Sequence, residues 1–200
     1  TWEPELAEEM SSIIGQESRA VGITSAMSPV IDVSRDPRWG RITETYGEDA
    51  ALTSAMASAF VKGIQGDELK EGVLATAKHF AGHGITEGGL NMGRNIVSER
   101  DMREIHCKPF QCAITEAGLK SVMNSYCSVN GEPVVGSKKM LTDILRGEMG
   151  FQGFVVSDYL SLDRLVDPFA VAENFEEAGI RAIQAGLDVE YPRSKGFSYK

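Results

Sequence analysis

Cysteine, excess positive charge and long apolar runs are all scarce in this sequence, and each scarcity excludes a class of protein. The three cysteines form no Cys-x-x-Cys pair, so we expect free, buried thiols rather than a disulfide framework or a cysteine metal site. Lys and Arg number 20 against 29 Asp and Glu, which argues against nucleic acid as a partner, because phosphate binding needs clustered cations. No segment approaches the roughly 20 apolar residues of a membrane span. A neutral substrate suits this charge balance better.

Apolar, strand-like segments alternate with segments of helical periodicity. The expected strands are residues 22–33, 72–80, 119–126, 155–158 and 185–191, and apolar residues at helical spacing lie between them, as in 52–64. This alternation predicts βαβ units and a parallel sheet. The chain starts in a helical pattern at residues 4–15 with no strand before it, and about five strands are too few for a closed barrel of eight βα units.

These counts predict one domain, residues 1–200, that is part of a (β/α)8 TIM-like barrel. We expect it to lack the first strands and the end of the barrel. The sequence is therefore interpreted as a fragment, and any targeting signal would lie outside it. The oligomeric state is not predicted.

Asp158 is the first candidate catalyst. It ends the apolar run 153–158 (GFVVSD), and the carboxyl ends of parallel strands open onto the ligand crevice of such folds. An acid in this position can meet a substrate while its strand stays buried. The alternative is that Ser157 and Asp158 cap the following helix.

Seven short motifs, taken in order, resemble the catalytic barrel of glycoside hydrolase family three, the family of β-glucosidases and β-xylosidases. They occupy residues 28–32 (SPVID), 35–41 (RDPRWGR), 44–49 (ETYGED), 78–80 (KHF), 98–104 (SERDMRE), 122–126 (VMNSY, with NG at 130–131) and 157–159 (SDY). The resemblance implies an exo-acting hydrolase of polysaccharide catabolism that removes a β-linked, non-reducing-end glucose or xylose from a small-molecule or oligosaccharide substrate. It also implies that no cofactor is needed, that a secreted or periplasmic location is plausible, and that an α/β sandwich domain, absent from this chain, follows the barrel.

By this resemblance Asp158 is the nucleophile of a retaining glycosidase and forms a covalent glycosyl-enzyme. Arg41, Lys78 and His79 are expected to hydrogen-bond sugar hydroxyls. The phenol of Tyr126 is expected to lie near the nucleophile, and Met123 and Tyr159 are expected to line the sugar pocket. Tyr159 stands where many members have tryptophan, which changes the aromatic face offered to the sugar. The implied substrate-binding set is Arg41, Lys78, His79, Met123, Tyr126 and Tyr159.

Structural roles compete with some of these assignments. An ion pair of Arg41 with Asp36 or Glu48 is the alternative to sugar contact. Lys78 and His79 are adjacent on a strand, so both reach one site only if the strand end twists or bulges. The segment 98–104 is expected to start a helix, with Ser98 as its N-cap and Asp101 near N3, and is left out of the site.

The sequence also departs from the family pattern. Leu90, followed by Asn91, stands after Glu87-Gly88-Gly89 where many relatives place a sugar-binding arginine, and Arg94 is too far along to be assumed equivalent. No acid/base residue is assigned, because in the β-glucosidase-like members it comes from the second domain. This chain alone is accordingly expected to hydrolyse glycosides poorly or not at all.

Three alternatives remain at this stage. Residues 78–84 (KHFAGHG) resemble the β-N-acetylglucosaminidase branch of the family, but Ala81 replaces a proline and residues 86–89 (TEGG) stand where that branch has Asp-Ser-His. A lysine ending a barrel strand, Lys78, is also the arrangement of a Schiff-base lyase. A non-catalytic carbohydrate-binding remnant is the third.

A metal site is not predicted. His79 and His83 are four residues apart, which would place them on one face of a helix, but Gly82 and Gly84 flank His83 and indicate a loop. No His-Glu-x-x-His pattern is present either. We therefore expect no catalytic metal.

Overall fold

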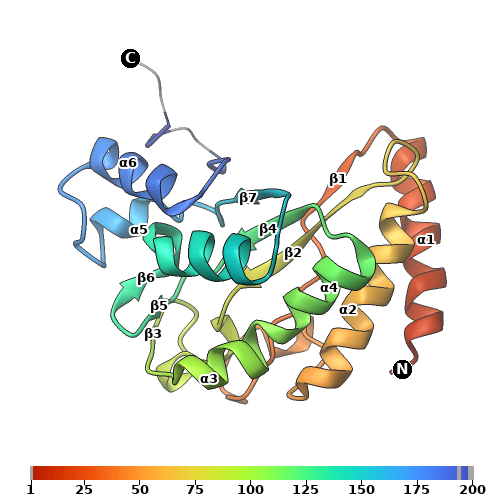
Figure 1. The fold of residues 1–200 in the computed structure, drawn as a ribbon, viewed down its shortest axis with the longest axis horizontal. Coiled ribbons are helices and arrows are strands. Elements are labelled where there is room, and N and C mark those ends of the chain that lie inside the picture. The colour runs from red at the N-terminus through yellow and green to blue at the C-terminus, as the bar shows by residue number, and fades with distance from the viewer. Residues whose placement is uncertain (1, 193–194, 198–200) are drawn as a thin grey trace.

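The sheet that organises the molecule is open, four-stranded and parallel (Figure 1). The computed structural model describes residues 2–192 and 195–197, and its strands lie in the order β1-β2-β4-β7, each neighbouring pair parallel. The strands are β1 (Ser25–Ala26), β2 (Leu74–Phe80), β4 (Ser121–Asn124) and β7 (Phe154–Val156). Parallel strands that pair in chain order with helices between them form part of a (β/α)8 barrel, and the predicted fold class is confirmed.

Helices connect these strands and cover the sheet. Three of them, α1 (Pro4–Ala20), α2 (Ala50–Gln65) and α4 (Lys108–Ala117), stand side by side (Figure 1). A short α3 (Glu99–Asp101) runs through the π-helical η4 (Met102–His106) into α4, and η6 (Lys139–Glu148), α5 (Asp163–Val166) and α6 (Phe175–Ala185) follow later in the chain. The 3-10 turns are η1 (Ile42–Glu44), η2 (His83–Ile85), η3 (Glu87–Gly89) and η5 (Val134–Gly136).

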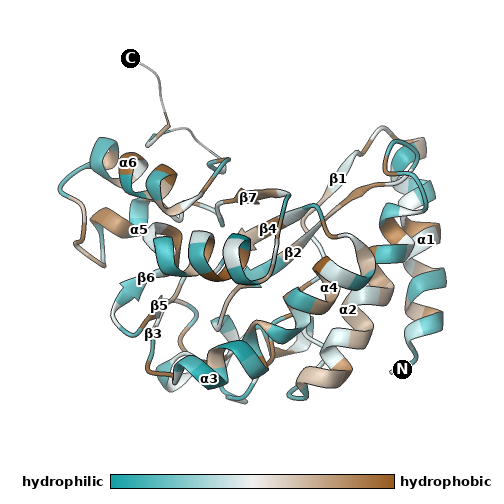
Figure 2. Ribbon diagram, in the orientation of Figure 1, coloured by the Kyte–Doolittle hydropathy of each residue, from teal (hydrophilic) through white to brown (hydrophobic). Residues whose placement is uncertain are grey.

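Helix α2 is buried between α1 and α4, and its sequence reflects that position. It is mostly pale to brown in the hydropathy colouring, whereas α1 is mostly teal (Figure 2). The contact with α1 requires Gly63, because a Cβ there would lie 2.0 Å from Ser11 Oγ and 2.2 Å from the carbonyl oxygen of Glu8. Helix α2 therefore has a helix on each of two sides and also contacts strand β2 of the main sheet.

Strands β2, β4 and β7 are largely buried on both faces, as expected for a parallel sheet between layers, whereas β1 is partly exposed. Ala75, Ala77, Val122 and Val155 are all fully buried. At the end of β2, Phe80 meets Phe110 of α4 edge to face, with ring centroids 5.1 Å apart. This packing fixes the carboxyl end of β2 against the helices.

A second, small sheet was not predicted. It consists of β3 (Arg94–Asn95), β5 (Ser128–Val129) and β6 (Glu132–Pro133), with β5 and β6 antiparallel. The hairpin turns at Asn130 and Gly131, whose φ values of 51° and 93° suit the tight turns that Asn-Gly forms. In the chain, β3 follows β2, and β5 and β6 follow β4. The small sheet is therefore built from segments that come after the carboxyl ends of two main-sheet strands.

Several expected elements are shorter than predicted. Residues 22–33 form only β1 and one bridge between Val30 and Lys78, and residues 185–191 contribute a single bridge between Val189 and Val156. The helix start is confirmed, because the hydroxyl of Ser98 accepts from the backbone N–H of Asp101 at 3.0 Å. The three cysteines are free and buried, as expected.

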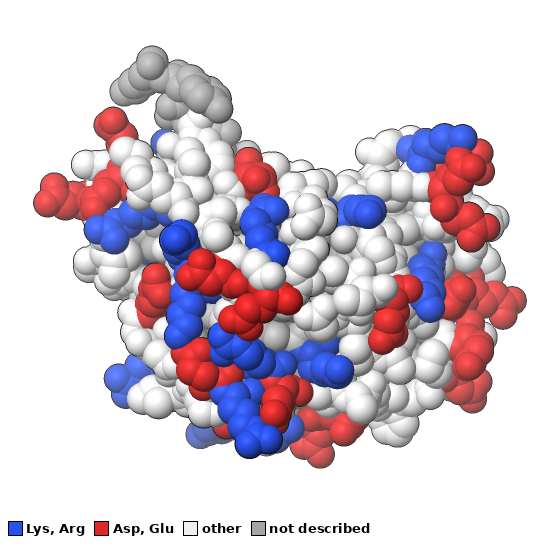
Figure 3. Space-filling view, viewed as in Figure 1, with Lys and Arg blue, Asp and Glu red and all other residues white. Residues whose placement is uncertain are grey.

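Charged residues of both signs are interleaved on the face shown in Figure 3. Arg103 pairs with Glu148 and Glu99 at 2.7 Å each, and Lys139 pairs with Glu99. This face therefore has no uninterrupted basic patch. Within the described ranges no helix is long and apolar enough to cross a membrane.

Candidate functional site

Polar residues from neighbouring strands meet at the carboxyl edge of the main sheet. Asp158 lies just after β7, Asn124 ends β4, and His79 lies near the end of β2. Asp32 comes from the segment that follows β1 and is joined to His79. The carboxyl ends of parallel strands share one edge, so chain segments far apart in sequence deliver these side chains to one place.

Asp158 is held at its backbone and at one of its two carboxylate oxygens. Its N–H donates to Asn124 Oδ1 at 3.2 Å, and Asn124 is itself fixed by donating to Ser161 Oγ at 2.8 Å. Oδ1 accepts the backbone N–H of Tyr159 at 2.7 Å. Oδ2 is buried and has no hydrogen-bond partner among the described residues, so this oxygen is the one available for chemistry.

The helix-capping alternative for Asp158 is wrong. Residues 159–162 form a turn rather than a helix. The next helix, α5, begins at Asp163 with Leu162 at its N-cap and has no side-chain cap. The carboxylate is therefore not engaged at a helix start.

His79 is fixed by a buried carboxylate on one side and faces Asp158 on the other. Asp32 Oδ2 accepts both the backbone N–H of His79 at 3.1 Å and its ring Nδ1–H at 2.8 Å. The other ring nitrogen, Nε2, lies 3.6 Å from Asp158 Oδ2. The pairing of β2 with β4 shifts register between Lys78 and Phe80, which is the irregularity expected if both Lys78 and His79 are to approach one site.

Burial decides the protonation states of this pair. It lowers the pKa of His79 to about 3 and raises the pKa of Asp32 to about 6, against the opposing effect of nearby cationic groups. At neutral pH His79 is therefore uncharged and Asp32 ionised, so the ring proton lies on Nδ1, toward Asp32. Nε2 then presents a lone pair toward Asp158.

A second buried histidine, His83, packs beside the first, with ring centroids 4.5 Å apart. Its Nε2 lies 2.9 Å from Asn91 Oδ1, and the same Oδ1 accepts the indole N–H of Trp39 at 3.3 Å. An indole nitrogen can only donate, so this Asn91 atom is an oxygen and His83 Nε2 carries the ring proton. Burial lowers the pKa of His83 to about 4. Its Nδ1 is an unprotonated acceptor with no partner among the described residues.

The two histidines meet through a turn, as the flanking glycines indicated. His79 lies on β2, whereas His83 begins η2 after Gly82, whose φ is 85°. The sequence argument correctly rejected a shared helix face. It did not anticipate that the turn would bring both rings together beside Asp158.

Two cations lie near this centre. Burial lowers the pKa of Lys78, Arg41 lowers it further, and Asp158 and Glu44 oppose the shift. Arg41 is bound through two nitrogens to Glu44, both at 2.8 Å. Its ion-pair partner is thus neither of the two acids considered from sequence; Asp36 pairs with Arg38 instead.

The other predicted pocket residues lie at different depths. Met123 is buried on β4 and Tyr126 is buried just after it. The Tyr126 hydroxyl donates to the carbonyl oxygen of Tyr159 at 2.7 Å, and burial together with the Asp158 charge raises the pKa of this phenol. Tyr159 is 59% exposed, and it contacts the cluster through its backbone N–H and carbonyl oxygen.

The segment that departs from the family pattern supplies a different residue. Leu90 is 62% exposed, and Arg94 pairs with Glu87 at 2.7 Å on the surface. Asn91 is the residue that reaches the cluster. Sequence reasoning missed its role and that of Asp32, although a carboxylate within the apolar stretch of residues 30–33 was a signal for Asp32.

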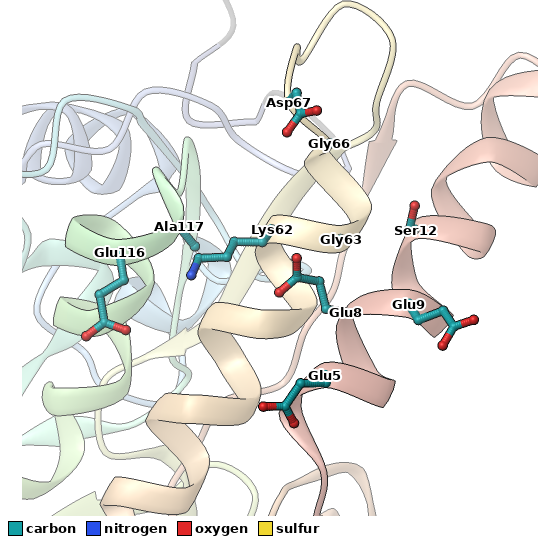
Figure 4. Close-up of a pocket in the computed structure, with 10 residues that line it drawn as sticks. All are labelled: Glu5, Glu8, Glu9, Ser12, Lys62, Gly63, Gly66, Asp67, Glu116 and Ala117. Carbon is teal, nitrogen blue, oxygen red and sulfur yellow. The ribbon is translucent and has the colours of Figure 1, made fainter.

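A separate groove of about 640 Å³ lies between the helices, not at the strand ends. It is lined by side chains of α1, α2 and α4 and the turn after α2, and most of the charged ones are acidic (Figure 4). They are Glu5, Glu8, Glu9, Lys62, Asp67 and Glu116. This groove contains none of the residues of the cluster around Asp158.

The cluster at the strand ends combines complementary chemical groups. Asp158 offers one free carboxylate oxygen, His79 and His83 offer ring lone pairs, and Lys78 and Arg41 offer donors. Such a set suits a neutral, hydroxyl-rich molecule, which both donates and accepts hydrogen bonds. A carboxylate with one free oxygen can also attack an electrophilic carbon.

Comparisons with known proteins point in one direction. The model described as "Glycosyl hydrolase family 3 N terminal domain" matches residues 1–198. A "Beta-xylosidase" from Formosa agariphila is 45% identical over 195 residues, covering 95% of this chain and 27% of the relative. A "Beta-glucosidase" from Rhizobium radiobacter is 35% identical, covering 96% of this chain and 21% of the relative.

Solved structures of β-glucosidases also match the chain. The crystal structure of a β-glucosidase from Listeria innocua in complex with glucose superposes with a TM-score of 0.93 at 34% identity, covering 98% of this chain and 28% of that one. The chain thus spans about a quarter of the length of the proteins it matches.

Proposed function

Because the chain belongs to glycosyl hydrolase family 3, we propose that it carries the nucleophile of a retaining, exo-acting β-glycosidase that removes terminal glucose or xylose. The observation that carries this proposal is the state of Asp158. One oxygen is held by the backbone of Tyr159, while the other is buried and has no hydrogen-bond partner in the part of the chain that the structure describes. The two sugars follow from the relatives, which include both a β-xylosidase and β-glucosidases.

The proposed reaction has two steps. Asp158 Oδ2 attacks the anomeric carbon, the bond to the glycosidic oxygen breaks, and that oxygen takes a proton from a second carboxyl group. Water, deprotonated by the same group, then attacks the anomeric carbon and releases Asp158. The second carboxyl should lie about 5–5.5 Å from the nucleophile, and we assign it to no described residue, since Asp32 is buried behind His79 and bonded to it.

The remaining residues of the cluster hold the sugar ring. His79 Nε2 accepts a hydrogen bond from a sugar hydroxyl, because the ring proton of His79 is committed to Asp32. Lys78 and Arg41 donate to hydroxyl oxygens, and hydrogen bonds to charged groups contribute about 1.5–3 kcal/mol each. Glu44 keeps the guanidinium of Arg41 in one orientation, which makes that donor directional.

The proposal is tested by trapping the intermediate. The intact protein is incubated with activated 2-deoxy-2-fluoro-glucoside and, separately, the xyloside, which slow the second step more than the first. Peptide mapping by mass spectrometry should find the sugar on Asp158, and the more rapidly labelling sugar identifies the preferred substrate. A turning-over enzyme that carries the sugar on another residue would contradict the assignment.

Asp32 is proposed as a positioning residue, because it does not face the substrate but fixes the proton on His79. Asp32→Asn removes the charge that favours the Nδ1–H form of the ring. We expect kcat/KM to fall about 10- to 100-fold, which corresponds to the loss of one charge-assisted hydrogen bond. Steady-state kinetics should show the loss with little change in the thermal midpoint.

Asp36→Asn is the matched control, because Asp36 lies on the same segment but pairs with the exposed Arg38. Its kcat/KM should equal that of the native protein. Equal losses in both variants would show that the segment, and not the Asp32–His79 bond, is responsible.

A further inference from the structure

Three potential ligand atoms lie together at the centre of the cluster. A ring nitrogen of His79, a ring nitrogen of His83 and a carboxylate oxygen of Asp158 all lie within 4.8 Å of one another, and all three residues are buried. The hydrogen bonds already described leave His79 Nε2, His83 Nδ1 and Asp158 Oδ2 as the atoms with free lone pairs. The two last-named atoms are buried without a partner among the described residues.

Acceptors that face one another need a positive or proton-bearing group between them. His79 Nε2 and Asp158 Oδ2 are 3.6 Å apart with no proton to share when the imidazole is neutral. A buried acceptor without a donor costs free energy. A sugar hydroxyl satisfies this need for one pair of atoms, whereas a cation satisfies all three at once.

The outer atoms of the same three residues are anchored in the manner of metal ligands. Asp32 holds the far nitrogen of His79 at 2.8 Å, Asn91 holds that of His83 at 2.9 Å, and the Tyr159 N–H holds the other oxygen of Asp158 at 2.7 Å. Partners of this kind fix the tautomer and orientation of metal-binding histidines. The arrangement thus includes the supporting contacts as well as the ligands.

The local charge allows a divalent cation. The charged groups near His79 are the anions Asp158 and Glu44 and the cations Arg41 and Lys78. Asp32 adds a further carboxylate. Three carboxylates against two cations leave a net charge of about −1 at neutral pH. The two cations weaken metal binding without preventing it.

We propose that His79, His83 and Asp158 together bind one divalent transition-metal ion, with Zn²⁺ the best fit, and that the bound ion reversibly blocks the enzyme. Two imidazoles and a carboxylate are ligands that Zn²⁺ prefers, at about 2.0–2.2 Å, with a fourth position open to water. The ion occupies Asp158 Oδ2, the oxygen that attacks the sugar. The inhibition rests on the proposed function, whereas the binding does not.

The test uses Co²⁺ as a spectroscopic stand-in for Zn²⁺ in the intact protein. Titration should produce the intense visible d–d absorption of four-coordinate Co²⁺ and saturate at one ion per chain, and Zn²⁺ should displace it. His83→Gln keeps a donor toward Asn91 but removes the Nδ1 lone pair, so Co²⁺ affinity should fall more than 10-fold. Asn91→Ala removes the contact that supports His83, together with the acceptor of the Trp39 indole N–H, and should weaken binding about 10-fold.

His106→Gln is the matched control, since His106 is also buried but is not one of the clustered ligands. Its Co²⁺ affinity should match that of the native protein, and circular dichroism should confirm that all variants are folded. No four-coordinate spectrum in the native protein, or a spectrum unchanged by His83→Gln, would overturn the proposed site.

Kinetics separate the site from the inhibition. Zn²⁺ should raise KM for a glycoside without changing kcat, and His83→Gln should lose most of this sensitivity. Binding without inhibition, in a protein whose Asp158 is labelled by the fluoro-sugar, would overturn the inhibitory role. Binding in a protein that is never labelled supports the site and counts against the proposed function.

Discussion

Asp158→Ala should reduce glycoside hydrolysis by about four orders of magnitude or more, because loss of a covalent nucleophile removes a whole step of the reaction. The substitution shortens a side chain that is 10% exposed and whose Oδ2 has no hydrogen-bond partner among the described residues, so the fold should tolerate it. Azide should restore turnover of an activated glycoside, since the small anion can enter the space of the carboxylate and attack in its place.

The product identifies the role of the residue. Azide that attacks from the Asp158 side gives the α-glycosyl azide, the opposite configuration to that of the β-linked substrate, and proton NMR distinguishes the two anomers. Asp143→Ala, at an exposed carboxylate on η6, is the control and should keep native activity. An Asp158→Ala variant that retains a tenth or more of the native kcat would show that another residue is the nucleophile.

Mild acid should destabilise the fold strongly. Burial lowers the pKa values of His79, His83 and His106 to about 3, 4 and 4, below the ordinary value near 6.5 that holds in the unfolded chain. Between pH 6.5 and 4 the unfolded state therefore binds about three more protons than the folded state, and stability falls as the pH falls. Each such proton is worth about 1.4 kcal/mol per pH unit.

Asp32 works in the opposite direction. Its raised pKa of about 6 means that the folded state binds one more proton than the unfolded state between pH 4 and 6. The net difference is about two protons, or on the order of 2.7 kcal/mol per pH unit, which is a large share of an ordinary folding free energy of about 5–15 kcal/mol.

Urea unfolding at pH 7 and pH 5, with a chelator present to exclude metal effects, measures this dependence. His106→Gln should reduce the slope of stability against pH by about one proton, because it removes one of the three buried histidines. A free energy of unfolding that is equal at the two pH values would contradict the assignment of neutral, buried imidazoles.

The main sheet and the position of Asp158 could be predicted because both leave a local signal. Apolar runs that alternate with helical periodicity indicated a parallel sheet, and a carboxylate at the end of such a run indicated the functional edge. The ends of the outer strands could not be predicted in the same way. Residues 22–33 read as one strand-like segment in the sequence, yet backbone pairing is limited to β1 and one bridge, because pairing depends on neighbours that the local sequence does not specify.

The contacts within the cluster could not be predicted from the local sequence either. Arg41 has acids on both sides in sequence, and only the 3-10 turn of η1 decides that Glu44 is its partner. Asn91 reaches His83 across the glycine turns that precede it, and Asp32 meets His79 from 47 residues away. Such choices depend on loop geometry, which a pattern of residue types does not determine.

The Tyr159 N–H that binds Asp158 Oδ1 has a consequence for the proposed nucleophile. In a free carboxylate the two oxygens exchange freely and share the negative charge equally. In this fold one is hydrogen-bonded to the backbone of the next residue and the other is not. The folded chain thereby distinguishes two atoms that are chemically identical, and the glycosyl ester should always form through the same oxygen, with the other retained as its carbonyl.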